Sequence, residues 1–375
     1  MKSINGLFYI IISIDNLRKA WEEVRKVKQK DSEIVSYSFG ITINLYLLHQ
    51  ELAKGTWKPQ AKDKFVKHEK KTREITPITI EGKIVAQAIY QVLSPIMNRK
   101  FSKNSYACIK GRGQHMCAQN VQRTFFNYHH KFSVFKGDIK GYFKHVNKKR
   151  LRKVIVDKIR DRLLVKLLFK FISAFTESGI PIGWLTSELF ANMYLDYLDQ
   201  YIRKYYPDLD FFRFMDDFVI STTNLKRLKA CVHDIENNVF KNLKLIENPK
   251  SKIYTNHVDF CGYVIYGGYK KPRIRILNSA FRRFKKYIMY GEFSKLFDAL
   301  PSLFGYAKFC MCRTSLVSRI YKLFSPLYII NHKTQEEYYT KFLTILGIKD
   351  QLTHEKGVKY NGEVGTNKGF RAKAA

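Results

Sequence analysis

Three aspartates stand where apolar segments of this 375-residue chain end. Asp138 follows the stretch "FSVFKG", and the adjacent pair Asp216 and Asp217 lies in "FRFMDDFVIS", with 78 positions separating Asp138 from Asp216. A buried carboxylate is costly without a partner, and carboxylates brought together by neighbouring strands repel one another and favour binding of divalent cations. Two such ions about 3.5 to 4 Å apart stabilise both the attacking and the leaving oxygen of an in-line phosphoryl displacement. The aspartates therefore suggest metal-dependent phosphoryl transfer, the chemistry with which polymerases form phosphodiester bonds.

The pair of aspartates is weak evidence alone, because Asp is common in solvated hairpin turns. Two further features favour a site. Both neighbouring segments of the pair are apolar, and a Gly/Pro loop that opens a helix, "GIPIGWLTS", lies between Asp138 and Asp216.

Charge identifies a class of partner. The chain has 67 Lys and Arg against 32 Asp and Glu, a formal charge of +35, and its basic residues alternate with Tyr and Phe in stretches such as "RRFKKYIMY". A Lys-rich surface that is merely solvated is the alternative, but +35 exceeds what solubility requires. We expect a nucleic-acid partner whose phosphates and bases these residues contact. The 45% hydrophobic content excludes a disordered chain.

The cysteine spacing and the N-terminal segment indicate little about function. The six cysteines form no CxxC pair, so neither a zinc ribbon nor a disulfide framework is predicted, and reduced thiols favour a cytoplasmic protein. The apolar stretch "LFYIIIS" is too short to span a bilayer, and we expect a short buried element there and no membrane partner.

Periodicity predicts alternating helices and strands. Helical spacing covers residues 15–55, 82–97 and 225–243, and one helix is expected across 148–172. Residues 57–80 suggest a hairpin with a basic turn, and residues 211–222 a hairpin with Asp216 and Asp217 at its tip. A long helix should follow the Gly/Pro loop, capped by Thr186 or Ser187. A further hairpin is expected at 258–277, and helices from 278 to about 324.

Taken in order, five strings of this chain resemble the successive palm motifs of reverse transcriptases. They are "VFKGDIKGYF", "GIPIGWLTSELFAN", "FRFMDDFVIS", "LKLIENPKSKI" and "FCGYVI". The resemblance extends over about residues 15 to 325, and an ordered set of this kind is specific. It implies an α+β fold with right-hand polymerase architecture, with fingers, a palm built on an antiparallel sheet and a small helical thumb. The implied parts are a helical lead-in (1–56), fingers (57–131), palm (132–271), thumb (272–330) and a partly disordered extension (331–375).

The same resemblance assigns the catalytic roles. It implies an RNA-directed DNA polymerase in which Asp138 and Asp216 hold two Mg²⁺ ions, which Mn²⁺ can replace, with the carbonyl of Ile139 as a further ligand and Asp217 shaping the metal site. Lys250 would donate a proton to the leaving pyrophosphate, and Lys252 is its rival.

Nucleotide and template contacts are implied in the same way. Phe143 matches the bulky residue that excludes a ribose 2′-OH, and Lys71 and Arg73 would bind the triphosphate. The alternatives are that Phe143 belongs to the core and that both cations are ordinary surface charges. The remaining nucleotide contacts are Ile182 and Gly183, and the nucleic-acid contacts are Arg112, Phe214, Met215 and Gly262. For "KGRGQH", which holds Gly111, Arg112 and His115, template contact and a simple turn both stay open.

Within the family, the strings "NSYACIKGRGQH", "GIPIGWLTSELFANMYLDYLD" and "LFGYAKFCMCRTSL" look most like reverse transcriptases of diversity-generating retroelements, of bacterial or phage origin. Reverse transcriptases of antiphage defence share parts of them, and a maturase-like protein that only binds structured RNA is a third reading. Two positions depart from the pattern: Phe214 replaces a frequent Tyr, and Glu188 replaces the usual Gln after Ser187. Ile182 stands where many retroviral enzymes have Gln, and we predict low fidelity because Ile makes no amide hydrogen bond near the nucleotide.

The resemblance also implies partners. These are an RNA template, a DNA or RNA primer and dNTPs, together with a structured non-coding RNA and a small accessory protein oligomer.

Overall fold

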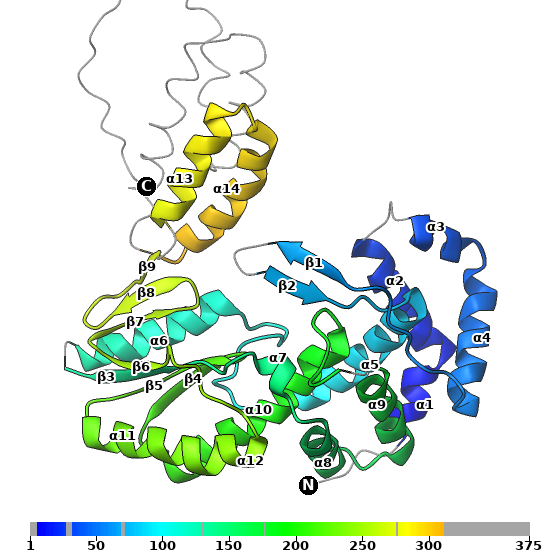
Figure 1. The fold of residues 1–375 in the computed structure, drawn as a ribbon, viewed down its shortest axis with the longest axis horizontal. Coiled ribbons are helices and arrows are strands. Elements are labelled where there is room, and N and C mark those ends of the chain that lie inside the picture. Colours follow the sequence, from blue (N-terminus) through cyan, green and yellow to red (C-terminus); the bar gives the residue numbers. More distant parts are fainter. Residues whose placement is uncertain are drawn as a thin grey trace, which may run out of the picture. The chain divides into compact units, whose positions relative to one another are not determined.

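The computed structural model describes residues 6–27, 32–68, 72–129, 131–175, 177–274 and 277–310 (Figure 1). The chain divides into two compact units. The first runs through residue 276 and includes residues 309–311, and the second begins at Leu277.

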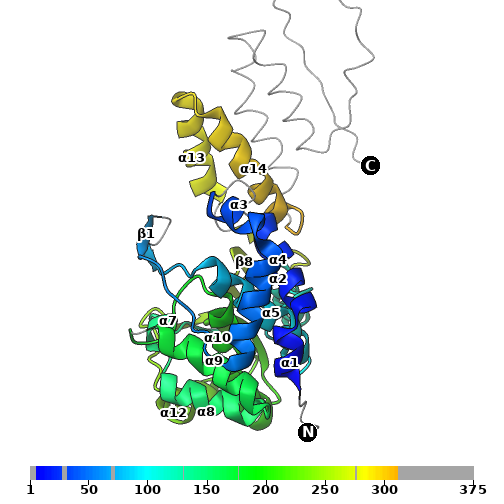
Figure 2. The ribbon, with the colours of Figure 1, turned by 90° about the vertical axis from the view of Figure 1, so that its right-hand side faces the viewer.

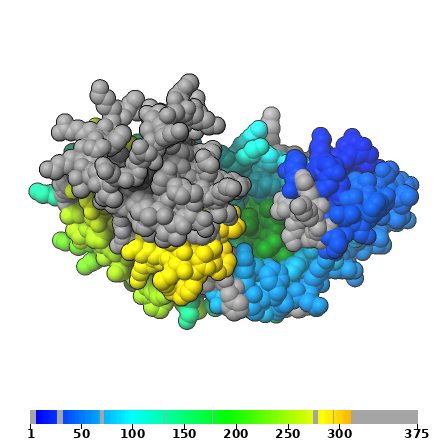
Figure 3. All heavy atoms as spheres, turned by 90° about the horizontal axis from the view of Figure 1, so that it is seen from above, coloured from blue at the N-terminus to red at the C-terminus, as the bar shows by residue number. Residues whose placement is uncertain are grey.

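Four helices open the first unit: α1 (Leu7–Ile12), α2 (Ile14–Val27), α3 (Ser32–Phe39) and α4 (Ile41–Lys54). Helix α1 is the predicted buried element, because four of its six residues, Leu7, Phe8, Ile11 and Ile12, are buried. Helix α4 ends at Gly55, whose φ of 72° is the left-handed conformation that makes glycine a common helix stop. Helices α1 and α2 pack on α5 (Ile80–Asn98), and α4 packs on α1, α2 and α3. Figure 3 shows the dark blue surface of these N-terminal helices beside the lighter blue of the residues that follow. The helical structure predicted between residues 15 and 55 is confirmed for the described residues.

A two-stranded hairpin precedes α5. Strands β1 (Phe65–His68) and β2 (Thr72–Ile75) are antiparallel, and Lys67 lies opposite Arg73. The predicted hairpin between residues 57 and 80 is confirmed, whereas its turn, with Lys71, lies outside the described residues. Helix α6 (Gln114–Tyr128) follows α5.

The central sheet has the strand order β4-β5-β3-β6, and all of its neighbours are antiparallel. Its strands are β3 (Ser133–Gly137), β4 (Asp210–Phe214), β5 (Asp217–Thr222) and β6 (Lys252–Thr255). All four strands are short. Strand β5 is almost entirely buried, and Phe218, Val219 and Ile220 have no exposed surface. The antiparallel palm sheet is thus as predicted.

Helices surround this sheet (Figure 1). Helix α6 contacts β4, while α11 (Leu225–Asp234) contacts β3 and β5. The helical segments from the sheet onward are α7 (Tyr142–His145), α8 (Lys148–Lys158), α9 (Arg162–Ala174), α10 (Leu185–Tyr205), a π-helix η1 (Ile235–Phe240) and α12 (Lys241–Leu243). A second small sheet holds β7 (His257–Phe260), β8 (Tyr263–Tyr266) and β9 (Arg273–Ile274).

Two local predictions were wrong. The single helix expected across 148–172 is two helices, because Ile159 is extended and the carboxylate of Asp161 starts a new helix by accepting a hydrogen bond from the amide of Leu164 at 3.0 Å. Neither Thr186 nor Ser187 caps α10. The N-cap is Trp184, and both hydroxyl residues are buried in the first turn.

In the second unit, α13 (Leu277–Met289) and α14 (Phe293–Ala307) are the helices expected from residue 278 onward. Residues 311–375, which include the rest of the predicted thumb and the predicted extension, lie outside the described residues. Among the described residues, no helix is long and apolar enough to cross a bilayer, and the described cysteines are free thiols.

Candidate active site

Strand pairing brings the three aspartates to one edge of the central sheet. Gly137, the last residue of β3, pairs with Phe218 on β5, so Asp138 and Asp217 leave the ladder side by side. Phe214 pairs with Asp217 across the β4–β5 hairpin, which leaves Met215 and Asp216 as its two-residue turn. The prediction that separate strands bring these carboxylates together is confirmed.

The hairpin turn is compact. Met215 has a φ of 59°, an uncommon conformation for a residue other than glycine and one that two-residue hairpin turns require. Gly137 is equally constrained, because a Cβ there would lie 2.2 Å from the Phe218 ring. Only glycine lets the two strands meet at this point.

Asp217 is partly buried and close to like charges. Burial is the main reason why its pKa is raised to about 7; Asp138 and Asp216 raise it further, while Lys136 opposes the shift. The Nζ of Lys136 lies 3.7 Å from Asp217 Oδ2, and Oδ1 is buried without a hydrogen-bond partner. The edge of the sheet therefore favours a bound cation or a proton.

Asn248 holds Asp138 from the opposite side. Its backbone amide donates to the Asp138 carbonyl at 2.8 Å, and its side-chain amide donates to Asp138 Oδ2 at 2.6 Å. Ser251 Oγ accepts a hydrogen bond from the Asp138 amide at 3.1 Å. These three bonds fix the backbone and one carboxylate oxygen of Asp138.

Lys250, the predicted proton donor, lies in the same loop. Its backbone amide donates to Asn248 Oδ1 at 3.1 Å, and its side chain is exposed. The rival, Lys252, lies on β6 with its ammonium 4.7 Å from the ring centroid of Tyr254. The loop thus links Lys250, and not Lys252, to the residue that holds Asp138.

Arg213 holds the β4–β5 hairpin in place. Its guanidinium is fully buried and donates to both carboxylate oxygens of Asp199, at 2.7 and 2.8 Å. The same group donates to the Met215 carbonyl at 2.9 Å. Ser105 Oγ and Asn192 Oδ1 accept its remaining hydrogen bonds, at 2.9 and 3.2 Å. A buried ion pair therefore attaches the Met215–Asp216 turn to α10.

The loop before α10 places the predicted nucleotide contacts. The amide of Ile180 donates to the carbonyl of Phe143 at 2.9 Å, and a Cβ on Gly179 would lie 2.0 Å from that oxygen. Gly183 has a φ of 98°, and a Cβ there would lie 3.2 Å from Ile75 on β2. The loop that holds Ile182 and Gly183 therefore adjoins both Phe143 and the end of the hairpin.

Trp184 fastens the other end of this loop. Its indole donates to the Thr76 carbonyl at 2.7 Å, and the side chain is buried. Glu188, the unusual residue one turn later, lies beside Cys108; burial first and then Glu188 raise the pKa of the Cys108 thiol to about 12. Glu188 thus faces the loop "NSYACIKG" in this structure.

Arg73, one of the two predicted fingers residues, is exposed. Arg73 lies on β2, and Lys71 lies outside the described residues. Lys64, just before β1, forms ion pairs with Glu74 and Glu177.

Of the residues predicted to contact nucleic acid, Phe214 is the last residue of β4, Met215 lies in the β4–β5 turn, and Arg112 and Gly262 lie in the connections before α6 and β8. Arg112 donates to the carbonyls of Ser102 and Ser105, at 2.7 and 2.6 Å, and Gly111 has a φ of 80°. These bonds favour the reading of "KGRGQH" as a turn. His115 Nδ1 lies 2.7 Å from the Tyr263 hydroxyl on β8, and Gly262, with a φ of 81°, lies in the turn before that strand.

The donor set suits a hard divalent cation. The carboxylates of Asp138 and Asp216 and the carbonyl of Ile139 would offer oxygen atoms, the ligands that Mg²⁺ prefers, and the buried Oδ1 of Asp217 has no hydrogen-bond partner. In the described part of the chain, no group of three or more His, Cys, Asp and Glu is placed to hold a metal.

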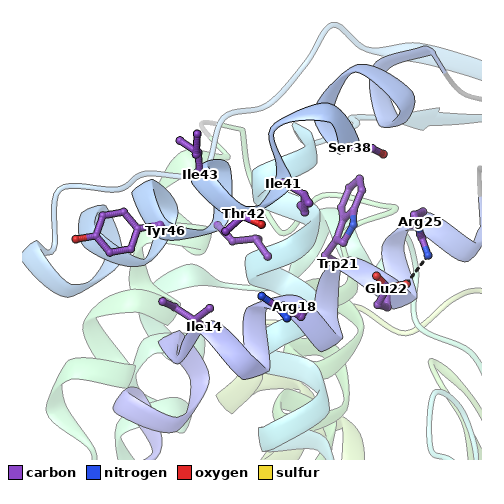
Figure 4. A pocket seen from close by; sticks show the side chains of 11 residues that line it. Ile14, Arg18, Trp21, Glu22, Arg25, Ser38, Ile41, Thr42, Ile43 and Tyr46 are labelled. Atoms are coloured by element: carbon purple, nitrogen blue, oxygen red, sulfur yellow. Dashed lines mark hydrogen bonds and ion pairs between the residues drawn. The ribbon is translucent and has the colours of Figure 1, made fainter.

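A pocket of about 550 Å³ lies elsewhere, between α2, α4 and the end of α3 (Figure 4). Its walls include Arg18, Trp21, Ile41 and Tyr46. None of the predicted site residues lines it, so it is separate from the aspartate edge.

Comparison with known proteins identifies the family. Residues 62–265, more than half of the chain, match the model of the family "Reverse transcriptase (RNA-dependent DNA polymerase)". The chain belongs to this family. The matched segment contains the β1–β2 hairpin, the central sheet and all three aspartates, so the predicted right-hand polymerase fold is confirmed.

Curated relatives of this reverse transcriptase are distant. The group II intron-encoded protein LtrA of Lactococcus lactis is 29% identical over 167 residues, which cover 41% of this chain and 27% of LtrA. Protein YkfC of Escherichia coli K12 is 27% identical over 179 residues, 44% of this chain and 47% of YkfC. The chain spans less than half the length of these two relatives.

Solved structures resemble it more weakly. Telomerase of Candida albicans, in complex with a fragment of telomeric RNA, matches with a TM-score of 0.48 and 12% identity, over 80% of this chain and 58% of that chain. Similarity at this level is too distant to guide the interpretation.

Proposed function

We propose that this protein is an RNA-directed DNA polymerase that copies an RNA template into DNA by attack of a primer 3′-OH on a deoxynucleoside triphosphate. The observation that carries the proposal is the meeting of Asp138 with the Asp216–Asp217 turn at one edge of the sheet. Retention of all three carboxylates favours catalysis over a maturase-like role limited to RNA binding.

Mg²⁺ bound at this edge would neutralise the charge that develops on the transferring phosphoryl group. Asp138 and Asp216 would hold it with the carbonyl of Ile139. Asn248 keeps Asp138 in position and Arg213 keeps the Met215–Asp216 turn in position. Most of the acceleration then comes from positioning and from electrostatic stabilisation.

Selection of deoxynucleotides is assigned to Phe143. Its ring is half-buried on α7, and the Gly179–Ile180 loop holds its carbonyl, so the side chain is a fixed steric barrier. Arg73 and Lys71 would bind the triphosphate from the hairpin, and Lys250 would protonate the leaving pyrophosphate. Lys250 is preferred to Lys252 because its loop also holds Asp138.

The subgroup proposed is the diversity-generating one, with error-prone synthesis. Ile182 supports it, because its side chain makes no hydrogen bond in the loop that adjoins Phe143 and β2. Antiphage defence with a dedicated non-coding RNA is the second candidate, and Glu188 is the residue that favours it, since it departs from the diversity-generating pattern. In both cases the partners would be a structured RNA and an accessory protein oligomer.

The test is primer extension on an RNA template with dNTPs and Mg²⁺, followed by sequencing of the product. Wild-type protein should make DNA and Asp216→Asn should not. Errors concentrated opposite template adenines would support the diversity-generating subgroup, whereas accurate or repetitive product would support defence. No DNA from wild type, even with co-purified RNA and proteins restored, would overturn the polymerase proposal.

Fidelity has its own test. Ile182→Gln should lower the error frequency by roughly tenfold, the selectivity that a single such hydrogen bond supplies. An unchanged error spectrum would contradict the role of Ile182.

A further inference from the structure

Positive charge is concentrated in one helical hairpin away from the aspartates. Residues 144–170 hold eleven Lys and Arg against two Asp. Residues 185–243, which form the helices and the hairpin that follow, hold seven Lys and Arg against nine Asp and Glu. Charge segregation of this degree within one compact unit points to a polyanionic partner at the first segment.

Helices α8 and α9 place most of this charge on their outer faces. On α8, Leu151 and Ile155 are buried while Lys149 and Lys153 are exposed. On α9, Leu164, Leu168 and Phe171 are among the buried residues, whereas Arg162 and Lys166 are exposed. The spacing of four residues puts each exposed pair on one side of its helix.

The two outer faces adjoin. Arg152 of α8 donates to Ser173 Oγ of α9 at 2.9 Å, and its guanidinium carbon lies 5.6 Å from the ring centroid of Phe169. We call the exposed cations of α8, α9 and their connection the α8–α9 basic surface. It consists of Lys149, Lys153, Arg160, Arg162 and Lys166.

Nearby carboxylates do not neutralise this surface. Asp161 is buried and accepts hydrogen bonds from the amides of Leu164 and Phe8, and Asp196 pairs with Lys158. Asp157 is exposed, and none of the five cations of the basic surface forms an ion pair with a described residue. Five neighbouring cations that lack a carboxylate partner repel one another until an anion binds.

We propose that the α8–α9 basic surface binds the phosphate backbone of a double-helical stem in a structured RNA. This inference rests on the proposed function and assigns its RNA partner to a surface. The exposed large apolar residues of α8 and α9 are Val156 and Leu163, which are aliphatic. The Phe169 ring is half-buried and already contacts the Arg152 guanidinium, so the surface offers charge without an exposed ring on which unpaired bases stack. Backbone recognition of a duplex needs only that charge.

The surface is separate from the nucleotide-binding edge. In Figures 1 and 2, α7 lies between α8 and the β1–β2 hairpin, and α8 is on the side away from that hairpin. A stem bound here leaves the predicted nucleotide contacts accessible. The enzyme would therefore hold its RNA and copy a template at the same time.

The test compares two sets of four alanine substitutions. The first replaces Lys149, Lys153, Arg162 and Lys166. The matched control replaces four exposed lysines outside the surface, which are Lys19, Lys54, Lys226 and Lys229. Both sets remove the same charge, and neither touches a predicted catalytic residue.

Binding of an RNA hairpin stem is measured over a range of salt concentrations, with a chain-terminated primer–template and the next dNTP saturating the active site. The surface variant should bind the stem roughly tenfold to a hundredfold more weakly near physiological salt, and the slope of log Kd against log salt should fall by about 3 to 4. The control should keep the wild-type slope. An equal loss in both variants, or no loss in the surface variant, would overturn the inference.

Two further readouts separate the possible failures. Polyuridine with the same phosphate content should compete weakly, and equal competition would overturn the assignment to duplex RNA. Primer extension on a short unstructured template should be unchanged in the surface variant. If wild type extends no primer, the proposed polymerase function fails, whereas normal extension with unchanged stem binding refutes the basic surface alone.

Discussion

The β4–β5 turn carries the predicted metal ligand Asp216, and the β1–β2 hairpin carries the predicted nucleotide contact Arg73, yet the two segments are held in different ways. The turn rests on Arg213, which is fully buried and bonded to Asp199 and to the Met215 carbonyl. On the hairpin, Phe65, Val66 and Arg73 are exposed. The aspartate edge is therefore held by contacts within the protein, whereas the hairpin, under our proposal, would gain its contacts from the substrate. Such a division suits phosphoryl transfer, in which charge positions must be fixed in advance.

The largest effect on stability is expected from removing the buried ion pair that holds the β4–β5 turn. Arg213→Met should lower the free energy of unfolding by about 3 to 5 kcal/mol, because it leaves the carboxylate of Asp199 buried and unpaired. The measurement is urea unfolding followed by circular dichroism, with primer extension on the folded fraction.

Arg227→Met is the matched control, since Arg227 pairs with Asp208 at the surface at 3.0 Å. Its change in unfolding midpoint should be too small to resolve. Equal losses for the two variants would show that the buried pair gives the turn no special support.

A smaller effect is expected on the hairpin. Arg73→Ala should raise the KM for dNTPs by roughly tenfold to a hundredfold, the loss of a charge-assisted contact to phosphate, and should leave the unfolding midpoint unchanged. Steady-state extension at varied dNTP concentration measures it. Lys67→Ala, at the paired position on β1, is the control. A KM equal to wild type for Arg73→Ala would remove the hairpin from nucleotide binding.

Between the two regions lies Phe143. Phe143→Ala should reduce discrimination against ribonucleotides by roughly tenfold to a hundredfold while kcat/KM for dNTPs changes little. Competing single-nucleotide insertions measure the ratio, with Phe169→Ala on α9 as control. Unchanged discrimination would support the alternative that Phe143 is a core residue.

The smallest effect concerns charge at the metal edge. The pKa of Asp217 is about 7, above the ordinary value of 3.8, so the folded protein favours the protonated form. Stability of metal-free wild type should therefore decline, relative to Asp217→Asn, as pH rises from 4 to 8, and the variant should be more stable at pH 8 by about 1 to 2 kcal/mol, a figure reduced for solvent screening.

Thermal unfolding in EDTA measures this difference, and Mg²⁺ should diminish it by stabilising the wild type. Asp208→Asn is a control of opposite sign, because hydrogen bonding to Arg227 lowers the pKa of Asp208. A wild type that is the more stable protein at pH 8 would contradict the raised pKa.

Local sequence patterns predicted the parts of the site that follow from strand ends and turns. Apolar runs ending in Asp138 and Asp216 indicated strands that meet, and glycines indicated tight turns. Arg213 and Asn248 were not predicted as site residues, because their roles depend on contacts across long stretches of chain. Arg213 bonds Ser105, 108 residues away, and Asn248 bonds Asp138, 110 residues away. The one available signal was a charged residue within the apolar strand "FFRFM".

The division between α8 and α9 was missed for the same reason. Helical spacing continues through residues 148–172, but Asp161 accepts a hydrogen bond from the Phe8 amide, 153 residues earlier. That contact and the cap at Leu164 favour a break at Asp161 over one continuous helix. The helical periodicity of residues 148–172 does not indicate this break.

The most direct test of the metal edge is the single-turnover rate of primer extension as a function of Mg²⁺, for wild type, Asp138→Asn, Asp216→Asn and the surface control Asp208→Asn. We predict that wild type and Asp208→Asn need Mg²⁺ and extend at similar rates. The other two should lose at least about a thousandfold in rate with little change in primer–template affinity. Extension by Asp138→Asn or Asp216→Asn within tenfold of wild type would contradict the account.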